Sequence, residues 1–160
     1  MASQEQIKQY VSDLERLQEM HEPIEIFGGT LRDIAEQSEF RQIDIAKALP
    51  VDESTVSKWM TGVQLPVIET LDSLLKALAV SAVDETYLRF AYNWDRWMRD
   101  VCHVIQKTKE FVENKGHSMT TNELQYAYHE KLLVIRSLLA PYETYKERNQ
   151  RLEEKEVSLP

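Results

Sequence analysis

The chain contains little glycine, proline and cysteine: its 160 residues include four glycines, five prolines and one cysteine. Runs that alternate polar and apolar residues are also scarce, which argues against β-strands. Leu, Glu, Lys, Gln and Ala are abundant instead, and these residues favour helices. The composition therefore predicts an all-α protein.

No stretch approaches the roughly 18–20 consecutive apolar residues of a membrane span. The opening segment MASQEQIKQY is polar and lacks the apolar centre of a signal peptide. A single cysteine, Cys102, excludes an internal disulfide and fits a reducing compartment. We therefore expect a soluble, cytoplasmic protein.

Motifs for catalysis and metal binding are also missing. There is no Gly-rich phosphate loop, nucleophile elbow or paired-carboxylate motif. The histidines are scattered without an i, i+4 pair, at His21, His103, His117 and His129. Cys102 and His103 are adjacent, but neighbouring helical residues point in different directions. We expect no metal, no cofactor and no enzymatic activity.

The net charge of −8 is not balanced by any basic block. Residues 1–27 carry 2 basic and 6 acidic side chains, residues 28–80 carry 5 and 8, and residues 81–160 carry 12 and 13. Any binding to nucleic acid therefore cannot depend on charge alone.

Helix-capping and helix-breaking residues divide the chain into three predicted parts. Residues 1–27 form an N-terminal helix and a connector, opened by a capping box of Ser3 and Gln6. Its apolar stripe has steps of three and four residues, at Ile7, Tyr10, Leu14, Leu17 and then His21. We expect Pro23 to end this helix and the Gly28-Gly29 pair of the connector to break helical structure. We expect the stripe to dock on the C-terminal part of its own or a partner subunit.

Residues 28–80 form the second part, in which short helices are expected near 30–38, 42–49, 53–60 and 67–79. Thr30 with Asp33 marks its start, and Pro50, Gly62 and Pro66 separate the elements.

Residues 81–160 form the third part, a helical C-terminal domain. We expect Asp84 to cap a long helix that ends at Gly116, and Thr120 with Glu123 to open another that runs to about Leu139. Pro141 should interrupt that helix, which leaves a charged last segment as a solvated helix or a fraying tail.

The spacing from Gln42 to Trp59 predicts two short helices that cross steeply through a tight turn. Counted from Gln42, the fifth residue is small, and the tenth, fifteenth and eighteenth are apolar and bury the crossing: Ala46, Val51, Val56 and Trp59. Leu49 joins this apolar set, whereas polar residues remain on the outer face of the second helix, behind an Asp52 N-cap: Glu53, Ser54, Ser57 and Lys58.

At this point the sequence resembles the Xre/Cro-type, phage-repressor-like helix-turn-helix DNA-binding family. The resemblance is gapless over roughly fifty residues, about 30–80. It rests on Gln42, Ile45-Ala46, Leu49, Val51, STVSKW (54–59), Gly62, Pro66, ETL (69–71) and KALAV (76–80). It implies a helix-turn-helix domain whose second helix reads DNA.

The resemblance nominates contacts to double-stranded DNA by position. Gln42 would contact backbone or base, and Glu53, Ser54, Ser57 and Lys58 would read base edges. Thr61, Val63 and Gln64 would lie beside phosphates, partly through backbone N–H groups.

Three features depart from the family pattern. Pro50 stands where glycine is usual, so the turn must be built differently, with Leu49 outside helical geometry. The loop TGVQLP lacks Lys and Arg, and Glu53 replaces a neutral residue. With only about three or four phosphate contacts per domain, affinity would have to come from pairing two domains on a two-fold site.

The C-terminal helices supply a candidate for that pairing. A dense aromatic run, YLRFAYNWDRWM, lies in a helical hairpin that offers few partners for so many large apolar groups. Some of these residues would be core, and the others would form a homodimer interface; the candidates are Phe90, Trp94, Trp97, Val101 and Ile105.

The sequence thus favours a bacterial or phage-type transcriptional regulator, a repressor that binds a palindromic operator as a homodimer. One alternative is a protein-interaction module of the same fold, an adaptor or anti-repressor. Another is an antitoxin that binds both DNA and a toxin partner. The acidic surface supports the protein-interaction reading.

Overall fold

The computed structural model describes residues 1–20 and 25–158, and all secondary structure in these ranges is helical. This confirms the predicted all-α class. Two compact units are present, one of Met1–Glu22 with Asp100–Pro160 and the other of Pro23–Arg99. The predictions that fall on His21 and Pro23 lie outside the described residues. Across the described ranges, no helix combines the length and apolar character needed to span a bilayer.

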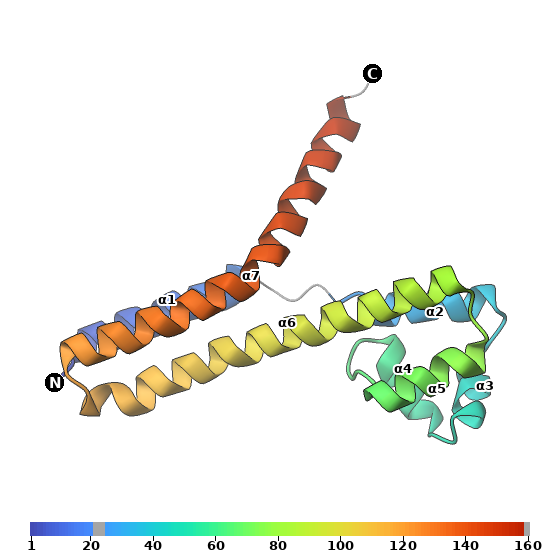
Figure 1. The fold of residues 1–160 in the computed structure, drawn as a ribbon, viewed down its shortest axis with the longest axis horizontal. Helices are drawn as coiled ribbons and strands as arrows, with labels where there is room; N and C mark the ends of the chain where they lie inside the picture. The colour runs from blue at the N-terminus through green and yellow to red at the C-terminus, as the bar shows by residue number, and fades with distance from the viewer. Residues whose placement is uncertain (21–24, 159–160) are drawn as a thin grey trace. The chain divides into compact units, whose positions relative to one another are not determined.

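The first unit, called the long-helix unit here, combines helices from both ends of the chain. Helix α1 (Gln4–Met20) packs against α7 (Thr121–Ser158) and against residues of α6 (Ala82–Lys115) from Asp100 on. The rings of Tyr10 and Tyr128 stack at 3.9 Å between centroids. Figure 1 shows α1 alongside the first part of α7. The apolar stripe of α1 thus docks on the C-terminal helices of its own subunit.

Two of the predicted N-caps are present in this unit. The Ser3 hydroxyl accepts the backbone N–H of Gln6 at 3.1 Å, and the Thr120 hydroxyl accepts that of Glu123 at 3.1 Å. The Gln6 side chain does not complete a capping box, because its amide donates to the Tyr10 hydroxyl and to the Thr121 carbonyl. As predicted, α6 ends just before Gly116, which opens the short 3₁₀ helix η1 (Gly116–Ser118).

The prediction that Pro141 interrupts the last helix is wrong. Helix α7 continues through Pro141 to Ser158, so the charged segment is helical as well. Leu139 and Tyr142 are buried on either side of the proline, and this packing holds the chain helical across the missing N–H donor. Figure 1 shows α7 changing direction between its orange and red parts, as expected of a proline within a helix.

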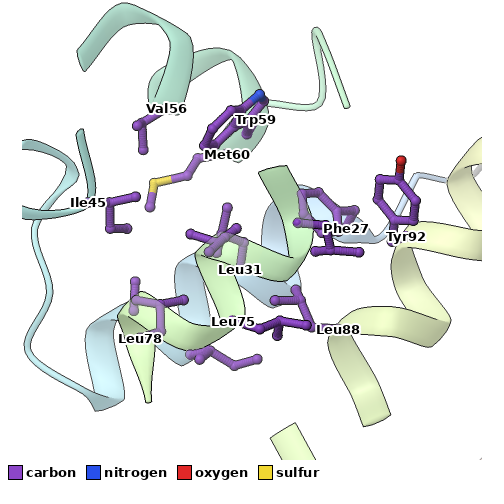
Figure 2. Close-up of a cluster of buried hydrophobic side chains, with 14 of the residues drawn as sticks. Phe27, Leu31, Ile45, Val56, Trp59, Met60, Leu75, Leu78, Leu88 and Tyr92 are labelled. Atoms are coloured by element: carbon purple, nitrogen blue, oxygen red, sulfur yellow. The ribbon is translucent and has the colours of Figure 1, made fainter. Parts of the chain in front are cut away.

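The second unit, called the short-helix unit here, contains four short helices and the part of α6 up to Arg99. The helices are α2 (Phe27–Gln37), α3 (Gln42–Ala48), α4 (Glu53–Met60) and α5 (Ile68–Leu78). Apolar side chains from all five elements converge on one core around Leu31 and Leu75 (Figure 2). Their bounds agree with the predicted helices to within a few residues, and α2 differs most.

Helix α2 begins at Phe27 and includes Gly28 and Gly29, so the prediction that these glycines break helical structure is wrong. A Cβ atom on Gly28 would lie 2.6 Å from the Met60 carbonyl oxygen and 2.8 Å from that of Trp59. Gly28 is therefore a close-approach residue, where the first turn of α2 meets the end of α4. Thr30 is not a cap, because its hydroxyl donates to the Ile26 carbonyl at 2.8 Å.

The start of α6 also differs from the prediction. The helix begins at Ala82, and the hydroxyl of Ser81 accepts the backbone N–H of Asp84 at 3.1 Å. Ser81 is thus the N-cap, and Asp84 lies in the first turn, where a carboxylate interacts favourably with the helix dipole.

Candidate nucleic-acid interface

The turn between α3 and α4 avoids the need for glycine. The backbone N–H of Val51 donates to the Ala46 carbonyl at 3.0 Å, so the hydrogen bond passes over Pro50, which has no donor. Leu49 has φ −103° and ψ 10°, outside helical geometry, as the proline predicted. This confirms a turn built around proline at the position where the family pattern has glycine.

The faces of α4 divide as the spacing predicts. Val56 and Trp59 are buried with Met60, and Figure 2 shows Val56 and Met60 near Ile45 of α3. Ala46 is buried under the crossing, while Leu49 and Val51 are partly buried against the same core. On the opposite face, Glu53, Ser54 and Lys58 are exposed and Ser57 is half-buried. Short polar side chains on an exposed helix face can enter a major groove without steric conflict.

The N-terminus of α4 carries negative charge. Asp52 occupies the N-cap position, where its backbone carbonyl accepts the N–H of Thr55 at 3.0 Å, but its carboxylate makes no capping bond. Glu53 follows in the first turn and is exposed. These two carboxylates suit the helix dipole, but they disfavour a phosphate at the same helix end.

The backbone of the loop after α4 is occupied by contacts within the chain. The N–H groups of Val63 and Gln64 donate to the Lys58 carbonyl at 3.0 and 3.2 Å. The Thr61 hydroxyl donates to the Ser57 carbonyl at 2.9 Å. These backbone donors are therefore engaged within the chain, whereas the side chains of Thr61 and Gln64 are exposed.

Gln42 is the first residue of α3 and is half-buried, next to the exposed Arg41. The Asp44 carboxylate accepts the Arg41 backbone N–H at 3.0 Å and its guanidinium at 3.2 Å. The backbone hydrogen bond, with the guanidinium contact, lowers the pKa of Asp44 below its ordinary value. Lys47 is exposed at the end of α3. Arg41 and Lys47 thus add two exposed cationic side chains to Lys58, which was nominated for DNA contact.

Two residues of α6 that the sequence reading did not single out fix the position of these elements. Asp95 is buried, and its two carboxylate oxygens accept the backbone N–H groups of Ile26 and Phe27 at 2.8 and 2.9 Å. It thereby caps α2 from a distant part of the chain. Burial raises the pKa of Asp95, and this effect exceeds the lowering by the two N–H donors.

Arg99, one helical turn further along α6, holds the loop after α4. Its guanidinium donates to the Gly62 carbonyl at 2.8 Å and to the Glu25 carboxylate at 3.0 Å. Gly62 has φ +79°, a conformation that favours glycine. The sequence did contain a signal for these two residues. Asp95 and Arg99 are an i, i+4 pair of opposite charge next to the otherwise apolar face of α6 that contains Leu88 and Met98.

The five residues nominated for dimerisation have different surroundings. Phe90 is exposed, and Trp94 and Trp97 are half-buried, all in the short-helix unit. Val101 and Ile105 belong to the long-helix unit and are each 1% exposed within their own chain. Any interface on the nominated residues would therefore involve the aromatic members of the set.

Among the described residues, no group of three or more His, Cys, Asp or Glu side chains could hold a metal ion. The described histidines and Cys102 therefore do not belong to a cluster of three or more potential metal ligands.

One segment of the chain matches a known family of domains. Residues 26–88 match the model of a family described as a helix-turn-helix domain. The match covers less than half of the chain and contains α2 to α5 with the first residues of α6. Neither a curated protein nor a solved structure matches the chain. The short-helix unit thus contains a segment that matches a helix-turn-helix domain, and α3, the turn at Pro50 and α4 lie within it.

Proposed function

We propose that the chain is a DNA-binding transcriptional regulator of the Xre/Cro type, and that α4 is its recognition helix. The observation that carries the proposal is the exposed polar face of α4, where Ser54 and Lys58 stand outward from a helix whose other face is fixed in the core. The helix-turn-helix match at residues 26–88 supports it.

In this proposal the side chains of α4 divide the work of recognition. Lys58 would donate to guanine O6 or N7, and the Ser54 and Ser57 hydroxyls could pair with several base edges. Glu53 is suited to accept from cytosine N4. Gln42, Thr61 and Gln64 would lie at the margins of the groove and set the register of the domain on the duplex.

The same geometry predicts weak binding by a single domain. The loop after α4 offers no basic side chain and no free backbone N–H at Val63 or Gln64. About three or four phosphate contacts would give a salt slope of about −3, which is shallow for a specific complex. We therefore propose binding as a homodimer to a palindromic operator, and repression by occupancy of the site.

The proposal is tested by selecting random duplex DNA with the purified protein at low salt. Enrichment of a two-fold-symmetric motif is the expected result, and its half-site spacing would report the distance between two recognition helices. If a folded protein enriches no motif, the DNA-binding proposal is wrong.

A variant pair localises the reading surface once a motif is known. Ser54→Ala with Lys58→Ala should abolish operator binding while the far-ultraviolet circular dichroism stays unchanged. Ser73→Ala with Lys76→Ala changes the same residue types on the exposed face of α5 and serves as the matched control. Equal loss in both double variants, or in neither, would remove α4 from its proposed role.

A second candidate function is favoured by the loop after α4. Val63 and Val67 are both exposed there, and acidic residues, Asp52 and Glu53, lie at the other end of α4. Exposed apolar side chains after α4, with acidic charge at its N-terminus, suit a protein partner better than phosphates. In that case the chain would be an adaptor or anti-repressor, and Val63→Lys would weaken capture of the partner, whereas in a DNA-binding protein it would strengthen DNA binding.

A further inference from the structure

The outer face of α6 carries an apolar stripe with the spacing of a coiled-coil seam. Its members follow one another at steps of four, three, four and three residues: Val83, Tyr87, Phe90, Trp94 and Trp97. The first three are 63%, 64% and 59% exposed, and the two tryptophans are half-buried. Heptad spacing of this kind keeps one continuous apolar line along a helix.

This stripe is not the face by which α6 joins the core of its own unit. The buried residues of the same helix segment form a separate line: Leu88, Ala91, Tyr92, Asp95 and Met98. Within the outer line, the rings of Phe90 and Trp94 stack at 6.2 Å and those of Trp94 and Trp97 lie 5.3 Å apart between centroids. The first half of this line, Val83, Tyr87 and Phe90, is exposed on α6.

We infer that this stripe is the docking site for the same stripe of a second copy of the chain. A heptad seam pairs with a helix of equal period, and α6 of a second copy offers the same spacing over the same length. The inference rests on the proposed function, because a palindromic operator requires a two-fold dimer. Its test uses no DNA, so the two can fail separately.

The exposed area is sufficient for such a pairing. Fully burying an aromatic side chain removes about 150–250 Å² from water, so Tyr87 and Phe90 with Val83 expose roughly 300 Å² per copy. Two copies would bury about 600 Å² through these residues alone. The tryptophan edges and the residues that flank the stripe bring the total toward the roughly 1,000 Å² that a biological interface needs.

Charge also favours a second copy at this position. Residues 82–99 contain three acidic and three basic side chains, although the whole chain has a net charge of −8. Two copies of this segment therefore meet without net repulsion. Helix α7 has exposed Tyr126 and Leu133, but the charged Glu130 lies between them, where a heptad seam would be apolar.

The experiment measures the mass of the full chain by size-exclusion chromatography with light scattering across micromolar concentrations. We expect the wild type to be a dimer. Phe90→Lys and, separately, Tyr87→Lys should raise the dimer Kd by roughly 30-fold or more, as for the loss of an interface hot spot. Leu133→Lys, at a position 67% exposed on α7, is the matched control and should remain dimeric.

Circular dichroism of each variant establishes that it is folded, and both substituted positions in α6 are exposed, so each variant gives an independent result. A monomeric wild type would overturn the inference. So would a dimer that persists in both α6 variants, or one that the Leu133→Lys control dissociates equally well.

Discussion

The short-helix unit and the long-helix unit are stabilised in different ways. In the short-helix unit, buried or half-buried polar side chains of α6 form hydrogen bonds with the backbone of other elements. Asp95 caps α2, and Arg99 holds the loop at Gly62. In the long-helix unit, α1 and α7 lie along one another with a stacked tyrosine pair. Every helix end leaves four backbone N–H or C=O groups without a partner in the helix. A unit built of several short helices has more such ends and therefore needs more hydrogen bonds of this kind.

The difference can be measured because all three tryptophans belong to the short-helix unit, at Trp59, Trp94 and Trp97. Tryptophan fluorescence therefore follows the unfolding of that unit, whereas circular dichroism follows both. Urea titrations read by both probes give the free energy of unfolding for each comparison below.

The largest effect is expected at Gly28, where the backbones of α2 and α4 approach closely, and Gly116 provides the contrast. Gly28→Ala places a Cβ against the backbone carbonyls of Trp59 and Met60, which cannot move aside easily, so we expect a loss of about 3 kcal/mol. Gly116→Ala places its Cβ 3.0 Å from the flexible side chain of Ile7, and we expect a loss below about 1 kcal/mol. Fluorescence should move only in the first variant; equal losses would show that both contacts relax alike.

Asp95→Asn should destabilise the short-helix unit by about 2 kcal/mol, because an amide can accept only one of the two N–H groups and directs its own donor at the other. The cost should depend on pH. Since burial raises the pKa of Asp95, the folded state binds more protons than the unfolded state between the ordinary value of 3.8 and the raised one. The free energy of unfolding of the wild type therefore falls as pH rises through that window.

The measurement is the difference in unfolding free energy between the wild type and Asp95→Asn across that pH range, since the other carboxyl groups titrate in both proteins. The advantage of the wild type should shrink from acid toward neutral pH. A growing advantage would mean that the two N–H donors outweigh burial at this carboxylate.

A smaller effect is expected in the long-helix unit from Tyr10→Leu. The substitution keeps an apolar side chain but removes the stack on Tyr128, a contact of about 1 kcal/mol. The circular-dichroism midpoint should fall while tryptophan fluorescence is unchanged. A shift of both probes would show that the two units unfold together.

The smallest effect is expected from Lys109→Met, which removes the ion pair with Glu15 between α1 and α6. The two groups lie 3.0 Å apart and are partly exposed, so solvent screening leaves about 0.5 kcal/mol or less. Raising the salt concentration should remove the difference between this variant and the wild type. A loss that persists in high salt would point to packing by the lysine stem instead.

The sequence predicted those elements whose cause is local. The spacing around Ala46, Val56 and Trp59 predicted the helix crossing, and Ser3 and Thr120 marked their helix starts correctly. It failed where a distant group decides. Gly28 reads locally as a breaker, and only the end of α4, some thirty residues later, shows why glycine is needed there.

The candidate site divides in the same way. The outward residues of α4 follow from periodicity, because burial of Trp59 fixes which face remains outside. The backbone N–H groups of Val63 and Gln64 could not be assigned in advance, since their use depends on how the loop folds back onto the Lys58 carbonyl. The prediction at Pro141 failed because it considered only the local cost of a proline within a helix. Burial of Leu139 and Tyr142 outweighs that cost.

If α4 reads DNA as proposed, its length limits how many base pairs one domain can recognise. Eight helical residues span about 12 Å, which corresponds to roughly three or four base pairs at about 3.4 Å each. A word of four letters recurs by chance about once in every few hundred base pairs, and a genome offers roughly 10⁶–10⁹ competing positions. One copy could therefore recognise a sequence of about four base pairs but could not specify a unique site in a genome. A unique site would require two copies that bind two such sequences at a fixed distance.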